Sequence, residues 1–114
     1  MPGKRNPLNL NPLQLKTLTL LQALAALPEH ARPEGDDGAV LVTDLPHPHG
    51  DHFHLGDAVV ASRDATGLGN PSAWLALERK GLILSRYPYE AVLTKAGLAY
   101  DTGLADTILH HADH

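Results

Sequence analysis

Residues 67–100 read GLGNPSAWLALERKGLILSRYPYEAVLTKAGLAY and carry the clearest pattern in the chain. Asn70 is a residue type that caps helices, and Pro71 suits the first helical position because the N–H that proline lacks would be unpaired there. Apolar residues then recur at helical spacing until Gly81, which is typical of the end of a helix. The pattern predicts a helix over residues 71–80.

Two short apolar runs follow this helix and predict a β-hairpin. The runs LIL and AVL flank the turn sequence RYPY, so the hairpin spans residues 82–93. Within the helix, Ala73, Trp74 and Leu77 share one face, and we expect that face to lie in the core.

The helix and hairpin together resemble part of a known family. Residues 77–83 read LERKGLI, and residues 93–97 read LTKAG. In winged helix–turn–helix regulators of the MarR and PadR kind, the recognition helix runs into a similar L-E-x-K-G-L-I string, and the wing is followed by L-T-x-x-G. The resemblance is close over residues 67–100 and extends to the rest of the chain in outline. It implies an α+β winged helix–turn–helix fold with a three-helix core, a short two-stranded wing and a C-terminal helix.

The other elements are predicted from the same kinds of signal. Asn11 and Pro12 open an apolar helix over residues 11–27, whose leucines cover more than one face. Such a helix is either central to the core or shared with a second subunit. We also expect a strand near residues 39–43, a helix near residues 57–65 and a C-terminal helix that runs from residue 95 to Leu109.

These elements form one domain over residues 1–114, in which residues 39–56 are a strand followed by a histidine-rich loop insertion. The first helix and the C-terminal helix are more apolar than a small domain hides alone. We therefore expect a homodimer that uses both helices.

Composition limits the class of protein. The chain has 114 residues, no cysteine and a net charge of −4 at pH 7. Disulfides are excluded, and no apolar run approaches the ~18 residues needed to cross a bilayer. The first residues lack the apolar centre of a signal peptide. We expect a soluble cytoplasmic protein without a membrane partner.

The charge is distributed unevenly along the chain. Residues 1–28 carry a net charge of +3, residues 29–62 carry −6 and residues 63–95 carry +2. Proteins that bind DNA are commonly basic over the contact face. The segment that contains the predicted recognition helix is weakly positive, which permits DNA binding.

The outer face of the predicted recognition helix holds the candidate DNA contacts. Bases in the major groove are read mainly by Arg, Lys, Asn and Gln, and Arg79 is the best such donor on this face. The helix N-terminus suits a phosphate, and an arginine in the wing suits a minor groove. We expect four residues to contact double-stranded DNA in a small transcriptional regulator: Asn70, Ser72, Arg79 and Arg86. Leu75 on the same face favours the alternative, a winged-helix module for protein–protein association without DNA binding.

Histidines are concentrated in residues 46–54, PHPHGDHFH. Imidazole nitrogens bind Zn²⁺ and Ni²⁺, so one interpretation is a metal site formed by His47, His49 and His52. A second interpretation is a solvated loop stiffened by proline, whose histidines cap turns or contact a neighbouring subunit. In a third, the alternating pairs His47/His49 and His52/His54 lie on one face of an extended chain. No cofactor is required for the predicted fold.

No catalytic set accompanies these motifs. Ser62, Ser72 and Ser85 lack a recognisable base and orienting residue, and no phosphate-binding loop of the P-loop type is present. We expect a protein that is not an enzyme.

Overall fold

The structure, a computed structural model, describes residues 6–35, 37–46 and 50–111. Its helices are α1 (Pro12–Ala25), the 3₁₀ helix η1 (Ser62–Gly69), α2 (Pro71–Arg79), α3 (Lys95–Ala99) and α4 (Ala105–Ile108). Its strands are β1 (Ala31–Glu34), β2 (Ala39–Val42), β3 (His52–Leu55), β4 (Ala58–Ala61), β5 (Ile83–Arg86), β6 (Glu90–Leu93) and β7 (His110–His111). The predicted α+β class is confirmed. None of the helices in the described ranges has the length and apolarity to span a membrane.

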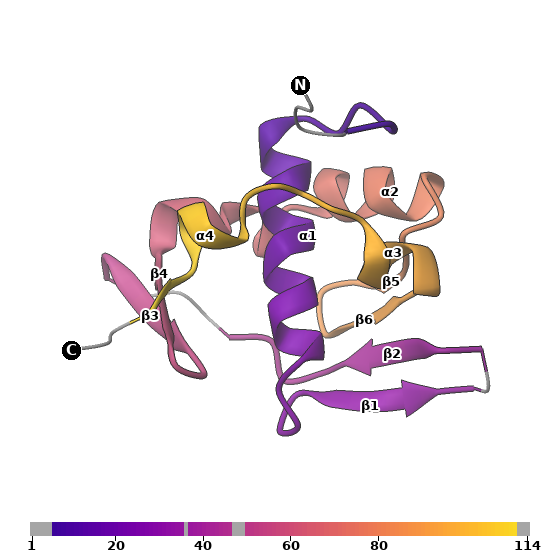
Figure 1. Cartoon of the computed structure of the whole chain (residues 1–114), viewed down its shortest axis with the longest axis horizontal. Helices are drawn as coiled ribbons and strands as arrows, with labels where there is room; N and C mark the ends of the chain where they lie inside the picture. The colour runs from indigo at the N-terminus through magenta and orange to yellow at the C-terminus, as the bar shows by residue number, and fades with distance from the viewer. Residues whose placement is uncertain (1–5, 36, 47–49, 112–114) are drawn as a thin grey trace.

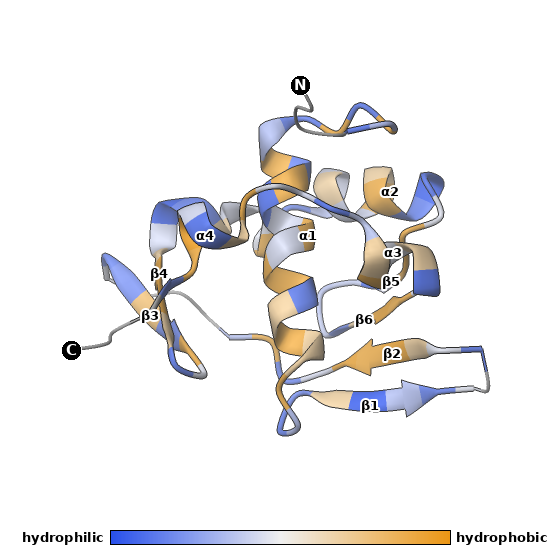
Figure 2. Ribbon diagram, viewed as in Figure 1, coloured by the Kyte–Doolittle hydropathy of each residue, from blue (hydrophilic) through white to orange (hydrophobic). Residues whose placement is uncertain are grey.

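Two antiparallel sheets flank α1, which runs through the middle of the molecule (Figure 1). The four-stranded sheet has the strand order β1-β2-β6-β5, and the three-stranded sheet has the order β3-β4-β7. β2 pairs with the second strand of the hairpin, so that Leu41 lies opposite Val92. This pairing confirms the predicted strand near residues 39–43 and the predicted hairpin. β1, an edge strand that is largely polar where β2 is apolar, is not predicted from the sequence (Figure 2).

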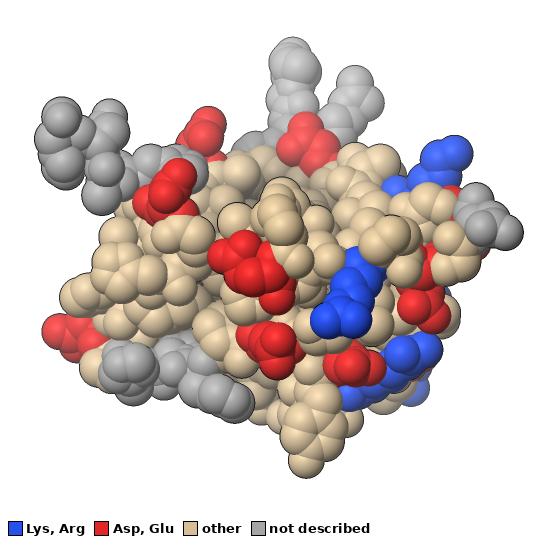
Figure 3. All heavy atoms as spheres, turned by 90° about the horizontal axis from the view of Figure 1, so that it is seen from below, with Lys and Arg blue, Asp and Glu red and all other residues tan. Residues whose placement is uncertain are grey.

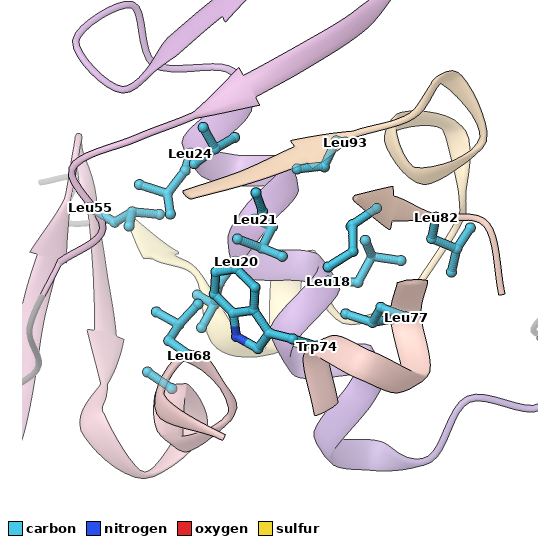
Figure 4. Packing of buried hydrophobic residues seen from close by; sticks show 14 of the residues in the cluster. Leu18, Leu20, Leu21, Leu24, Leu55, Leu68, Trp74, Leu77, Leu82 and Leu93 are labelled. Atoms are coloured by element: carbon cyan, nitrogen blue, oxygen red, sulfur yellow. The ribbon is translucent and has the colours of Figure 1, made fainter. Parts of the chain in front are cut away.

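α1 begins at a capping box and packs in the core. The Asn11 side chain accepts a hydrogen bond from the N–H of Gln14 at 2.8 Å, and the Gln14 side chain accepts one from the N–H of Asn11 at 3.0 Å. Four leucines of α1 are fully buried: Leu18, Leu20, Leu21 and Leu24. They point toward Leu93 of the four-stranded sheet on one side and toward Leu68 of η1 on the other (Figure 4). Of the two interpretations of this helix, burial within one chain therefore accounts for its apolar faces.

α2 confirms the predicted helix and the face that it buries. Ala73, Trp74 and Leu77 are at most 3% exposed. Gly81 follows the helix with a φ of +78°, a left-handed conformation that favours glycine.

η1 approaches α1 most closely at Gly67. A Cβ atom on Gly67 would lie 1.7 Å from Oγ1 of Thr17, so the approach requires a residue without a side chain. The next residue, Leu68, is buried. The indole N–H of Trp74 donates to the carbonyl oxygen of Gly67 at 3.1 Å. Gly67 thus links α1, η1 and α2.

Two predictions for the middle of the chain are wrong. Residues 57–65 form β4 and the start of η1 instead of an α-helix, and β3 lies within residues 39–56, where only a loop was expected after the first strand. Along β4, buried and partly exposed residues alternate, which is the pattern of a strand covered on one face. Pairing with β3 stabilises it, and Phe53 lies opposite Val60.

The predicted long C-terminal helix is also wrong. α3 ends at Ala99, Tyr100 has an extended backbone, and α4 and β7 follow as separate elements. The Gln22 side chain donates to the carbonyl oxygen of Tyr100 at 2.7 Å, and the hydroxyl groups of Thr19 and Thr102 form a buried hydrogen bond of 2.6 Å. These contacts with α1 stabilise an extended segment in place of a continuous helix.

Candidate nucleic-acid interface

α2 has an exposed face opposite its buried one. Ser72, Leu75 and Arg79 are exposed, and Leu75 is 46% exposed. This orientation is the one that the sequence predicts for the candidate recognition helix. No hydrogen bond or ion pair joins the guanidinium of Arg79 to another residue in the described part of the chain. Its five N–H donors are therefore available to a ligand.

Asn70 caps α2 with its side chain. The side-chain oxygen accepts hydrogen bonds from the backbone N–H of Ser72 at 2.9 Å and of Ala73 at 3.4 Å. The first turn of a helix has N–H groups without partners in the helix, and this cap satisfies two of them. A phosphate at this end of α2 would compete with the Asn70 oxygen for the same donors. The geometry therefore gives Asn70 a role in positioning α2.

The β5–β6 hairpin is attached to α2 through Tyr87. The Tyr87 ring packs edge-to-face on Trp74, with centroids 5.2 Å apart, and its hydroxyl donates to the carbonyl oxygen of Gly69 at 2.8 Å. Aromatic pairs of this kind contribute about 0.5–1.5 kcal/mol beyond the burial of their area. The sequence does not predict that Tyr87 attaches the hairpin to α2. The sequence does contain a signal for this contact, because an aromatic residue lies in the hairpin turn and the chain has a single tryptophan with which it can pack.

Arg86 lies at the end of β5 and pairs with two carboxylates. Its guanidinium nitrogens are 3.4 Å from Glu90 and 3.7 Å from Glu34, and its side chain is 51% exposed. Exposed ion pairs contribute roughly 0–1 kcal/mol to stability. Arg86 can therefore exchange these partners for a phosphate, but the two acids lower the positive potential around it.

Two other basic side chains near α2 have polar partners within the chain. Nζ of Lys80 donates to the carbonyl oxygen of Leu8 at 2.8 Å, and Lys16 forms an ion pair with Asp64 at 2.8 Å. Figure 3 shows the molecule from below, from the side of β1 and β2, and there acidic side chains lie among the basic ones. Arg79 is the basic residue of α2 itself, and its guanidinium has no polar partner among the described residues.

The candidate metal ligands are described only in part. His47 and His49 lie outside the described residues. His52 is exposed on β3, and its ring lies edge-to-face with that of His54, with centroids 5.8 Å apart. The predicted alternation of His52 and His54 on one face of an extended chain is confirmed. Across residues 6–35, 37–46 and 50–111, no group of three or more His, Cys, Asp or Glu side chains lies close enough to hold a metal ion.

Comparisons with known proteins do not assign this chain to a family. An assignment of function therefore depends on the geometry of its own residues, because a fold alone does not establish an activity. No protein-family model, no curated protein and no solved structure matches the chain.

Proposed function

We propose that this chain is a small winged-helix DNA-binding protein that acts as a transcriptional regulator. In this proposal α2 is the recognition helix, η1 is the helix that precedes it, and the β5–β6 hairpin is the wing. The order of the elements supports it, because α1, β2, η1 and α2 are followed by a hairpin whose second strand pairs with β2. The β3–β4 hairpin is then an insertion between β2 and η1.

The exposed face of α2 beside the attached hairpin is the observation that carries the proposal. Ser72 and Arg79 lie on that face, and Tyr87 fastens the hairpin to the start of the same helix. The major groove of DNA admits one α-helix, and residues beside that helix then meet the backbone or the adjacent minor groove. A helix and a hairpin in fixed relation can therefore contact one duplex together.

The four candidate residues have different roles in this proposal. Arg79 donates to a guanine edge, and the hydroxyl of Ser72 donates to a phosphate near the helix N-terminus. Asn70 holds the first turn of α2 in the conformation that binds. Arg86 leaves its two carboxylate partners and inserts into a minor groove.

Binding to random-sequence duplex DNA tests the proposal, with the purified, tag-free chain at about 50 mM and 200 mM salt. Each phosphate that the chain neutralises makes the affinity fall roughly 3.5-fold over this range, because counterions are released on binding. No detectable binding at the lower salt concentration would reject the proposal.

Replacing Arg79 separates base recognition from phosphate contact. We expect Arg79→Ala to weaken binding to a preferred sequence by about 1–3 kcal/mol if Arg79 reads a base, and to weaken binding to all sequences equally if it contacts a phosphate. Fluorescence anisotropy with both kinds of duplex measures this. Arg32→Ala is the matched control, because it removes an exposed arginine of β1 with the same change in charge. Equal losses from the two substitutions would contradict a specific role for α2.

Exposed apolar side chains favour a second candidate function, protein–protein association without DNA binding. Leu75 on α2 is 46% exposed, and Leu84 on β5 is 52% exposed. Leucine donates no hydrogen bond to a base edge, so its place on the outer face of α2 suits an apolar partner. A chain that fails to bind duplex DNA and loses a protein partner on Leu75→Glu substitution would have this function.

The homodimer remains a proposal and needs a different interface from the one expected from sequence. Four of the six leucines of α1 are fully buried within the chain, and the long C-terminal helix does not form. Leu75 and Leu84 are therefore the candidates for contact with a second copy. Sedimentation equilibrium of the wild-type chain and of Leu84→Glu measures this, and a monomer at all concentrations would exclude the dimer.

A further inference from the structure

The outer face of the three-stranded sheet carries histidines from its edge strand β3. Phe53 and Leu55 are buried, each 5% exposed, whereas His52 and His54 are exposed. Successive side chains of a strand point to opposite faces, so His52 and His54 share one face. Their ring centroids are 5.8 Å apart, with an angle of 77° between the ring planes.

The register of the sheet places His110 on the same face. His54 lies opposite Val59 of β4, and Val59 lies opposite His110 of β7. Directly opposed residues point to the same side of a sheet, and two spacings of about 4.8 Å separate the outer strands. Ala61 lies opposite His52, and its small side chain leaves space above this part of the sheet.

We propose that His52 and His54 together bind a divalent transition-metal ion such as Zn²⁺, with one ring nitrogen from each. Zinc binds imidazole nitrogens at about 2.0–2.1 Å in a tetrahedral arrangement, which places two ring centroids about 5 Å apart. The observed separation of 5.8 Å is close to this value. Both side chains are exposed, which leaves room for the rotation that turns one nitrogen of each ring toward the ion.

The backbone that carries the two imidazoles is held by the core. Phe53 and Leu55 belong to the same buried cluster as Val60, and all four residues of β3 pair with β4. A fixed spacing lowers the entropy lost when the second ligand binds the ion. The described residues contain no group of three ligands, so the site has two protein ligands there and water completes the coordination. This site lies on a different sheet from the β5–β6 hairpin, and the proposal does not depend on DNA binding.

Isothermal titration with Zn²⁺ tests the site in a background that lacks the other clustered histidines. The background carries five substitutions: His47→Ala, His49→Ala, His110→Ala, His111→Ala and His114→Ala. We expect it to keep one zinc ion per chain, because His52 and His54 remain. Complete loss of zinc binding in this background would overturn the proposal.

Two single substitutions in the same background identify the ligands. His52→Ala and His54→Ala should each lower the zinc affinity by at least about tenfold, and the double substitution should leave no bound ion. His30→Ala is the control, because His30 lies between α1 and β1, where its ring contacts the carbonyl oxygen of Thr43, and its replacement should leave the affinity unchanged. Thermal unfolding of the variants without metal checks that the substitutions at the exposed residues His52 and His54 do not affect folding. Unchanged affinity after both His52 and His54 are replaced would also overturn the proposal.

Discussion

Strand β6 at the centre of the four-stranded sheet is buried more deeply than strand β3 at the edge of the three-stranded sheet. In the four-stranded sheet, Ala91, Val92 and Leu93 of β6 are all buried, so this strand is covered on both faces. In the three-stranded sheet, β3 buries only alternate residues, and β7 has two residues. A strand covered on both faces is part of the centre of the core, whereas a strand covered on one face leaves the other for solvent or a ligand.

The difference separates stability from ligand chemistry in this molecule. α2 and the hairpin around Trp74 contribute most to the core, while the outer face of the three-stranded sheet presents His52 and His54 to solvent. We expect substitutions in the first region to change the free energy of unfolding most, and exposed positions in the second to change it little.

The largest effect is expected for Trp74→Ala. Trp74 is 1% exposed, so its truncation should lower the free energy of unfolding by about 3–5 kcal/mol. Urea denaturation measures this. Leu75→Ala, at the neighbouring exposed position, should stay within about 0.5 kcal/mol of the wild type. A small effect of Trp74→Ala would mean that the region around α2 is not the centre of the core.

The second largest effect is expected for Gly67→Ala, which should lower the free energy of unfolding by about 1–3 kcal/mol. The added Cβ atom would overlap Thr17 and force η1 away from α1. Gly69→Ala is the matched control in the same 3₁₀ helix, because no heavy atom lies within 4 Å of the Cβ position there. Thermal unfolding compares the two, and equal losses would show that η1 does not depend on close contact with α1.

Val60→Ala tests the three-stranded sheet and should destabilise the chain by about 1.5 kcal/mol, from the loss of two buried methyl groups. Val60 is fully buried, whereas its neighbour Val59 is partly exposed on the other face of β4. Val59→Ala should therefore have a smaller effect in the same urea experiment. The reverse order would contradict the assignment of the buried face of β4.

The smallest effect is expected for Tyr87→Phe. This substitution keeps the contact with Trp74 and removes the hydrogen bond to Gly69, which contributes about 0.5–1.5 kcal/mol. Tyr89→Phe is the control, because Tyr89 is 77% exposed. Urea denaturation of both variants should show a lower free energy of unfolding for Tyr87→Phe alone. No difference between them would mean that the hydroxyl does not fasten the hairpin to α2.

The helix and hairpin around Trp74 could be predicted because their signals are local. Asn70 caps α2 through bonds to residues two and three positions away, and Gly81 supplies the backbone conformation that ends it. The phase of the helix then predicts that Ser72 and Arg79 are exposed. The pairing of Arg86 with Glu34 could not be predicted, because β1 is distant in the sequence and was not recognised as a strand.

For α1, α2 and the hairpin, caps, breakers and apolar periodicity within the sequence were sufficient, because each signal acts between near neighbours in the chain. The secondary structure of two other regions depends on contacts between distant segments. Residues 58–61 became a strand because β3 pairs with them, and the chain after Ala99 became extended because Gln22 and Thr19 of α1 bind it. A short apolar segment has little local preference between helix and strand, so burial and the hydrogen bonds of its partner decide between them.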